Sequence, residues 1–492
     1  MTLTTLIIGF AITAAILTFL LKKYISNGAN KTWLFFLQEF VGVWFVFSGF
    51  VKAVDPMGTA FKMQQYFAEF EQTFKPTAMK FIAPLFPVMA EYSVGFSIFM
   101  ILLEILLGVA LIIGYAPKWT SRIFFILLIF FTVLTGFTYL TGYVPSNKNF
   151  FNFSAWGEYE KLQMRVNDCG CFGDFLKLDP KVSFFKDLGL LVPGILFLLF
   201  TKSFAQLWQP GVRKGIILAT ALVSLAFSWY NTFMNEPVVD FRPFKNGADI
   251  ATTRKTELDA AQAVKIENAI ATNKKSGEKV NIPYANYLKD FKKYPKEEWN
   301  IKFEYGESEV AKTKVSDYMI MDNEGKDITL DLLNHEGYSL MVNSYKVHGD
   351  MTSEKVMVSD TIYADSVYMV KKDTFTKQII AKIDQVESQQ EKFIPSFGEG
   401  PIIKEKLNPI LNYFVDKGIM TYAVTGGLGP IQMKGLAEYT GAKYPIYQAD
   451  DILLKTIARS NPGLILWKNG KIVQKWHYKH LPTKEELEGL MK

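Results

Sequence analysis

Apolar segments long enough to cross a bilayer fill the first half of this 492-residue chain, whereas charged residues dominate its second half. A membrane-spanning helix needs about 20 mostly apolar residues. Six segments meet this requirement and are predicted to be membrane helices: Leu3–Leu21, Trp33–Val54, Tyr92–Tyr115, Ile123–Tyr143, Phe184–Thr201 and Gly215–Phe233. Three prolines and frequent charges interrupt a further aromatic region, Met57–Met89, which we interpret as an amphipathic or re-entrant segment at the membrane surface. The sequence thus predicts a polytopic protein that contacts the lipid bilayer.

The basic residues of the connecting loops indicate an orientation in the membrane. The first segment is followed, not preceded, by two lysines, which favours an uncleaved helix over a signal peptide. The first, third and fifth loops contain no Asp or Glu, and their basic residues are Lys22, Lys23, Lys31, Lys118, Arg122, Lys202, Arg213 and Lys214. Loops of this kind belong on the cytoplasmic side. We therefore expect a bacterial inner-membrane protein whose N-terminus, fourth loop and C-terminal domain are periplasmic.

The charge of the chain argues against a nucleic-acid partner. The formal net charge is only +6, and no basic arm or stripe stands out along the sequence. A protein that binds nucleic acid normally concentrates its Lys and Arg residues on one face. The basic residues of the first half are explained better by membrane topology.

The only two cysteines of the chain, Cys169 and Cys171, lie in the fourth loop. A Cys-x-Cys pair must bend its backbone to close a disulfide, and strained disulfides are often the labile or catalytic ones. Gly170 and Gly173 supply backbone freedom for such a turn. A redox pair, a structural disulfide and two idle thiols all remain compatible with this pattern. A metal site is not expected, because two thiolates need two further ligands and all four histidines lie in the distant second half.

Ionisable residues within the predicted spans are further candidates for function. Such groups are costly in a bilayer and normally face the bundle interior or a water-filled cavity. Glu104 lies near the middle of its span and is predicted to make a polar contact in the bundle core, structural or proton-linked. Lys52 and Asp55 are close enough in sequence to form a functional pair, although Lys52 could also extend its side chain to the headgroups. No residue marks a cofactor site, and a quinone is possible without being indicated.

Three motifs in this half resemble the DoxX/MauE group of small membrane proteins. They are Asp168-Cys-Gly-Cys-Phe-Gly173, Ser48-Gly-Phe-Val-Lys-Ala-Val-Asp-Pro56 and Leu103-Glu-Ile-Leu-Leu-Gly108. The resemblance covers about residues 33–201 and implies a four-helix bundle. It also implies a role for the Cys pair in the redox maturation of exported proteins, as in the methylamine-utilisation members of the group. Nothing in this chain points to methylamine itself.

Strands alternate with helices in the second half of the chain, which predicts an α/β domain. A helix is expected at Thr256–Ala271, and hairpin turns are expected at Lys275–Glu278 and Asn323–Gly325. From the patterns we divide the chain into a first membrane helix with its cytoplasmic loop (1–32), a DoxX/MauE-like bundle (33–201), a sixth membrane helix (202–234), a tether with a small β-rich segment (235–314) and a periplasmic α/β domain (315–492).

This last domain resembles thioredoxin-like proteins of the peroxiredoxin/TlpA kind. The resemblance rests on the entry hairpin that ends at Asp327-Ile-Thr329 and on Asn461-Pro-Gly-Leu-Ile-Leu466. It implies that Pro462 occupies the cis-proline position facing the active dithiol. The strand Met341–Asn343 should then lead to a Cys-x-x-Cys motif, but the segment Ser344–Asp350 that follows contains no cysteine. The domain is therefore expected to bind or dock a partner without thiol chemistry of its own.

These observations favour a thiol-disulfide oxidoreductase-like membrane protein. In this hypothesis Cys169 and Cys171 exchange electrons with an exported or periplasmic protein, which the soluble domain presents to them. The main alternative is a non-enzymatic scaffold or accessory subunit of an envelope complex. A small-molecule transporter is also compatible with six spans, but the sequence shows no inverted repeat or pair of broken helices.

Overall fold

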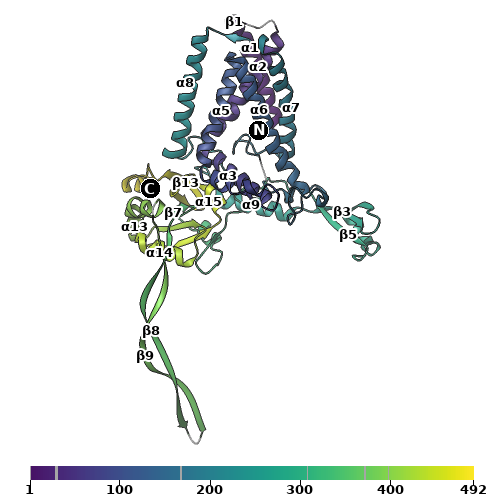
Figure 1. The fold of residues 1–492 in the computed structure, drawn as a ribbon. Helices are drawn as coiled ribbons and strands as arrows, with labels where there is room; N and C mark the ends of the chain where they lie inside the picture. Colours follow the sequence, from purple (N-terminus) through teal and green to yellow (C-terminus); the bar gives the residue numbers. More distant parts are fainter. Residues whose placement is uncertain (1, 28–30, 167–168, 307, 371–372, 397) are drawn as a thin grey trace. The chain divides into compact units, whose positions relative to one another are not determined.

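Six long apolar helices form the membrane part of the protein, as predicted. The computed structural model describes residues 2–27, 31–166, 169–306, 308–370, 373–396 and 398–492, and it divides into two compact units, Met1–Arg242 and Pro243–Lys492 (Figure 1). Within the described residues, the helices of the first unit that are long and apolar enough to cross a membrane are α1 (Leu3–Leu21), α2 (Thr32–Val54), α5 (Ser93–Ile113), α6 (Pro117–Leu140), α7 (Pro180–Leu199) and α8 (Pro210–Trp229).

Two shorter helices occupy the aromatic region between the second and third of these spans. They are α3 (Pro56–Phe74) and α4 (Leu85–Glu91). Helix α3 begins with a proline in its first turn, and the Asp55 side chain accepts a hydrogen bond from Gly58 N at its N-terminus. Neither helix is among the candidate membrane spans. At the opposite end of the bundle, the short strands β1 (Ile25–Asn27) and β2 (Gln206–Leu207) pair with each other.

The spanning helices bury one face and expose apolar side chains on the other. In α1 the buried residues recur every fourth position, at Leu6, Phe10, Ala14 and Thr18. Residues three to four apart share one face of a helix. Ile8, Ile12 and Ile16 lie off this face, and each is more than half exposed. Exposed isoleucines suit a lipid environment, which is consistent with a helix that meets the bilayer along one side.

The second unit is built on a mixed six-stranded sheet, which confirms the predicted α/β domain. Its strand order is β13-β12-β7-β10-β11-β6. The strands are β6 (Ile320–Met321), β7 (Tyr338–Ser344), β10 (Met420–Gly426), β11 (Ile446–Ala449), β12 (Gly463–Lys468) and β13 (Lys471–His477). Strands β7, β10 and β11 run parallel to one another, while β12, β13 and β6 join as antiparallel neighbours.

Apolar side chains fill both faces of this sheet. Successive residues of a strand point to opposite faces. In β7, Leu340 and Val342 belong to one core cluster, whereas Met341 belongs to the other. Helices pack around the sheet: α9 (Ile250–Ala263), α11 (Thr329–Leu333), α12 (Glu399–Ile402), α13 (Asn408–Asp416), α14 (Pro430–Thr440), α15 (Asp451–Ile457) and α16 (Lys484–Leu490). Phe244 and Ile250, from the stretch expected to be a tether, are fully buried in the cluster that contains Met341.

One secondary-structure prediction in this half is wrong. A helix was expected over Thr256–Ala271, but α9 ends at Ala263 and the chain continues as strand β3 (Ile266–Asn273). Strand β3 pairs with β4 (Lys279–Pro283) on one side and with β5 (Trp299–Tyr305) on the other. Pairing along both edges overrides the local helix preference of this Ala-containing segment. The turn expected at Lys275–Glu278 does join β3 to β4.

A long two-stranded ribbon extends from the α/β domain. Strands β8 (Asp350–Val370) and β9 (Asp373–Ile394) pair in antiparallel fashion over their full length (Figure 1). Along the chain, the ribbon follows strand β7 and precedes helix α12. At its base Phe393 is buried against the sheet, in the cluster that contains Leu340.

Candidate functional site

Close packing of helices α2 and α5 positions the charged residues of the membrane unit. Glycines at the contact allow the two backbones to approach each other. A Cβ atom on Gly42 would lie 2.8 Å from the carbonyl oxygen of Gly108, and a Cβ atom on Gly108 would lie 2.7 Å from Val46 N. Gly49 is equally constrained, because its Cβ atom would lie 2.5 Å from Cγ1 of Ile105. Two of these glycines belong to the motifs singled out in the sequence, so those motifs encode helix packing as well as charge.

Lys52 of α2 and Glu104 of α5 form an ion pair inside the bundle. Lys52 Nζ lies 2.6 Å from Glu104 Oε1 and 2.8 Å from Oε2. Lys52 is only 7% exposed and Glu104 only 2% exposed. The Lys52 side chain therefore remains inside the protein and does not reach toward the headgroups. The predicted polar contact of Glu104 in the bundle core is present, and its partner is Lys52. Asp55 caps helix α3.

Ser48 connects this ion pair to the cysteine loop. Its Oγ lies 3.0 Å from Glu104 Oε2 and 2.9 Å from the carbonyl oxygen of Cys171, and its single hydroxyl proton can be donated to either. The same oxygen accepts a hydrogen bond from Lys52 Nζ at 3.2 Å. Ser48 thus links the Glu104 carboxylate and the Lys52 ammonium group to the backbone of Cys171.

The cysteine loop folds back onto the bundle through a tight turn. Gly170 and Gly173 adopt positive φ angles of 64° and 53°, a backbone conformation that favours glycine. Between them Phe172 is buried, with its ring centroid 6.5 Å from that of Trp44 and 6.3 Å from that of Phe47. The buried ring anchors the turn on α2. Asp168, the first residue of this motif, lies outside the described residues.

Cys169 is buried and Cys171 is half-buried, and both are present as thiols. Burial raises the pKa of the Cys171 thiol above its ordinary value, and the nearby charge of Asp187 adds to this effect. The positive charge of Lys186 acts in the opposite direction and lowers the pKa. Since the thiolate is the reactive form of cysteine, these two charges adjust the reactivity of Cys171.

Lys186 and Asp187 form a second buried ion pair, which the sequence analysis missed. They are neighbours in the second turn of α7, and their side chains are 8% and 2% exposed. The hydroxyl group of Thr135, on α6, donates a hydrogen bond of 3.0 Å to Asp187 Oδ2. Two adjacent charges near the start of an apolar span were the signal that could have revealed this pair, because charges within a span are costly unless they are paired.

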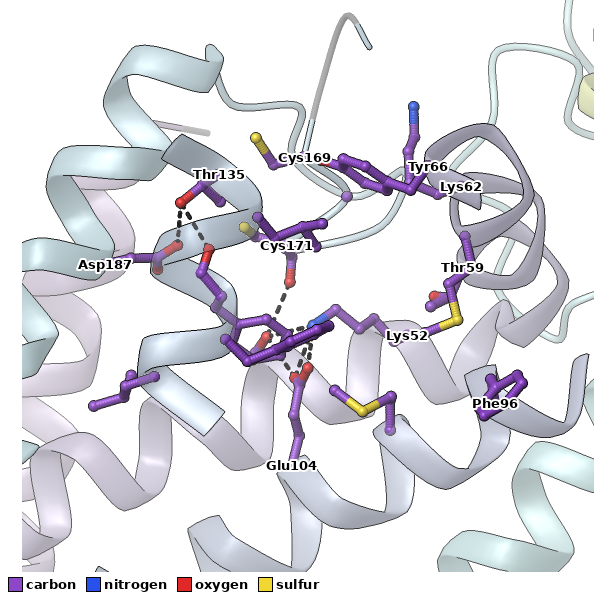
Figure 2. A pocket seen from close by; sticks show the side chains of 18 of the residues that line it. Lys52, Thr59, Lys62, Tyr66, Phe96, Glu104, Thr135, Cys169, Cys171 and Asp187 are labelled. Carbon is purple, nitrogen blue, oxygen red and sulfur yellow. Dashed lines mark hydrogen bonds and ion pairs between the residues drawn. The ribbon is translucent and has the colours of Figure 1, made fainter. Parts of the chain in front are cut away.

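The two ion pairs, both cysteines, Ser48 and Thr135 border one cavity of about 330 Å³ within the membrane unit. Figure 2 shows Cys169 and Cys171 on the loop beside the Lys52–Glu104 pair, with Asp187 and Thr135 on the α6–α7 side. The rest of the lining is mostly apolar and includes Trp44, Phe45, Met63, Phe67, Phe70, Phe86, Met89, Phe96, Met100, Phe130, Phe131 and Leu134. A mostly apolar pocket with a few converging polar groups is the usual form of a small-molecule site.

The C-terminal domain places its own polar cluster beside Pro462. The Asn461–Pro462 peptide bond is cis, in agreement with the position that the thioredoxin-like resemblance assigns to it. Asn461 Nδ2 donates hydrogen bonds to Glu399 Oε1 at 2.9 Å and to the carbonyl oxygen of Lys346 at 2.8 Å. His348 Nδ1 lies 2.9 Å from the other carboxylate oxygen of Glu399. Ser344 Oγ lies 3.0 Å from Asn461 Oδ1. The side chains of Ser344, His348, Glu399 and Asn461 thus form one hydrogen-bonded cluster beside the cis peptide bond.

Within the part of the chain that the structure describes, no three His, Cys, Asp or Glu residues are grouped so that they could hold a metal ion.

Comparison with known proteins gives no match: no family model matches the chain, and neither a curated protein nor a solved structure is similar to it. The fold and the geometry of the site therefore carry the functional argument.

Proposed function

We propose that this chain is a multi-pass inner-membrane protein that takes part in the thiol-disulfide chemistry of exported proteins through Cys169 and Cys171. The observation that carries the proposal is that both cysteines border the same cavity as two buried ion pairs. Paired charges and reactive side chains gathered in one cavity are typical of functional sites in membrane bundles. The three motifs shared with the DoxX/MauE group support the same function.

The reaction would be an exchange between two cysteine pairs. When Cys169 and Cys171 form a disulfide, a partner thiolate attacks one sulfur and gives a mixed disulfide. The second partner thiolate then attacks the partner's own sulfur in the mixed disulfide and releases the protein's cysteine. The partner gains a disulfide, and the protein regains its two thiols. Because the chain contains no other cysteine, these two must carry any such chemistry. The charge pattern of the loops supports a periplasmic location for the pair.

The C-terminal domain would serve as the docking module. Its thioredoxin-like features include the cis bond at Pro462, while its polar cluster takes the place of a dithiol. A domain with this site can bind an extended or partly folded partner without reacting with it.

The proposal is tested by the redox state of the pair in intact cells. The thiols are trapped with a membrane-impermeant reagent, and the purified chain is titrated against a thiol buffer of defined potential. We expect a reversible intramolecular disulfide that is accessible from the periplasm. A Cys169→Ser/Cys171→Ser variant, present at wild-type levels in the membrane, should fail to restore the function of a deletion strain. Full rescue by this variant would refute the redox function.

The same experiment distinguishes a second candidate, a non-enzymatic envelope scaffold. The observation that favours it is the cysteine-free site of the C-terminal domain, from which the paired β8–β9 ribbon also extends. A scaffold predicts that the double serine variant works normally, whereas deletion of the C-terminal domain abolishes function.

A further inference from the structure

The cavity beside the cysteines has the size and the lining of a site for a small aromatic molecule. Its volume of about 330 Å³ falls within the range of small-molecule pockets. Cys169 and Cys171 form part of its wall, so a molecule in the cavity would be next to both thiols. A thiol pair that acts repeatedly needs a second redox partner to restore its oxidised form.

The wall of the cavity combines charged and polar groups with apolar ones. The polar lining residues other than Ser48 and the cysteines are Lys52, Thr59, Lys62, Tyr66, Glu104, Thr135, Lys186 and Asp187, whereas the remaining wall is formed mainly by aromatic and methionine side chains. Lys186 Nζ carries three N–H donors, and its contact with Asp187 Oδ1 uses one of them, so this ammonium group can also donate a hydrogen bond to a carbonyl oxygen. The aromatic wall suits a flat apolar ring. The preferred occupant is therefore a flat ring that carries carbonyl acceptors at its edge.

Two aromatic residues of the cavity wall are partly exposed on spanning helices. Phe96 on α5 and Phe130 on α6 both line the cavity, and they are 38% and 51% exposed. Both helices are candidate membrane spans. This arrangement favours a lipid-soluble occupant whose apolar tail extends into the bilayer.

We propose that the cavity binds the ring of an isoprenoid quinone, which is the two-electron oxidant of Cys169 and Cys171. This inference rests on the proposed redox function of the pair and names its electron acceptor. Isoprenoid quinones combine a flat ring, two carbonyl oxygens and a lipid-soluble tail, which suit the aromatic wall, the Lys186 ammonium donor and the partly exposed Phe96 and Phe130 of the cavity.

The proposed step balances in atoms and electrons. The two S–H bonds of Cys169 and Cys171 break, and one S–S bond forms between them. The two electrons released by the sulfurs pass to the quinone ring, and the two protons end on its two oxygens. The products are one protein disulfide and one quinol. The buried ion pairs stabilise the charges that appear while the protons and electrons move.

Cavity-filling variants test the inference in the full-length chain, purified, reduced and reconstituted in lipid nanodiscs. The probes are a short-chain benzoquinone and a short-chain naphthoquinone, and the measured quantity is the quinol formed. We expect one quinol per chain with at least one of the two probes, and none with Cys169→Ser/Cys171→Ser. Leu134→Trp should slow the reaction about tenfold, because the added ring overfills the cavity. The matched control is Val133→Trp, whose position is 67% exposed and does not line the cavity.

A second pair of variants, on helix α7, separates filling of the cavity from misfolding of the protein. Leu190 lines the cavity from α7, whereas Leu188 on the same helix does not line it and is 37% exposed. Leu190→Trp should slow quinol formation, and Leu188→Trp should not. For every variant the cysteine pair is also titrated against the thiol buffer, and an unchanged titration shows that the loop is intact.

The outcomes separate the two proposals. If the pair titrates reversibly but no quinol forms, or if cavity-lining and control variants react at the same rate, the quinone site is wrong while the redox function stands. If the pair does not titrate at all, the proposed function fails, and the quinone step fails with it.

Discussion

The membrane site and the C-terminal site use similar polar residues in opposite ways. In the membrane unit, two buried ion pairs border a cavity and lie beside the only thiols of the chain. In the C-terminal domain, the side chains of Asn461, Glu399 and His348 hydrogen-bond to one another next to Pro462. The first arrangement leaves room for a ligand among charged groups. The second satisfies its polar groups internally.

This difference indicates a division of labour between the two units. Mutual hydrogen bonds hold the polar side chains near Pro462 in place, and the segment that leads away from β7 carries no cysteine. The cysteines lie on a glycine-containing loop against the bundle, where nearby charges adjust the pKa of the Cys171 thiol. We infer that chemistry belongs to the membrane site and recognition to the soluble domain. Each of the following predictions tests one side of this comparison.

The largest effect on stability is expected from Glu104→Leu. Removing the carboxylate leaves the Lys52 ammonium buried without its ion-pair partner, which costs about 3–5 kcal/mol. The thermal unfolding midpoint of the chain in detergent should fall sharply. The double variant Lys52→Met/Glu104→Leu removes both charges and should regain most of the loss. Equal midpoints for the single and double variants would show that the pair does not act as a unit.

A smaller effect is expected from Asn461→Ala in the C-terminal domain. The change removes hydrogen bonds to Glu399 and to the Lys346 carbonyl group and should destabilise the domain by about 1–3 kcal/mol. Chemical denaturation followed by the fluorescence of the buried Trp467 provides the measurement. The redox titration of Cys169 and Cys171 should remain unchanged. A shift in that titration would contradict the division of labour between the two units.

The smallest effect concerns the pH dependence of Cys171. Because burial raises its pKa, the thiolate fraction should keep increasing above pH about 8.5, the ordinary pKa of cysteine. The alkylation rate of a Cys169→Ser variant should therefore still rise in that range. Lys186→Met removes a positive charge that lowers the pKa of Cys171. This variant should therefore slow alkylation several-fold below pH about 8.5. Lys181→Met, an exposed position five residues earlier on α7, is the control. A rate that levels off near neutral pH would contradict the raised pKa.

Local patterns were sufficient to predict the membrane helices of this protein, but not the β8–β9 ribbon or strand β3. All six predicted spans overlap the observed apolar helices, because a spanning helix is recognised by the length and hydrophobicity of a continuous segment. The strand around Met341 was also expected from its apolar run. The error at Thr256–Ala271 shows the limit of this reasoning. Strand β3 forms there because β4 and β5 pair with both of its edges, and a local pattern carries no information on such partners.

The candidate site was predictable only in part. Cys169, Cys171, Lys52 and Glu104 stood out because charges and paired cysteines are rare in an apolar region. The sequence paired Lys52 with its near neighbour Asp55 as a possibility, whereas the structure pairs it with Glu104, 52 positions away. Lys186 and Asp187 were overlooked, although they are close enough to Cys171 to affect its pKa.

The sequence by itself determined that this chain has six apolar membrane helices, a mixed α/β domain without cysteines and a single Cys-Gly-Cys turn. These properties follow from composition and order along short segments. Only the tertiary structure decided which charges pair and that both thiols share one cavity. The reason is physical: a buried charge takes whichever partner the packed helices bring within hydrogen-bond distance, and that packing depends on contacts such as Gly42 with Gly108 between helices far apart in the sequence.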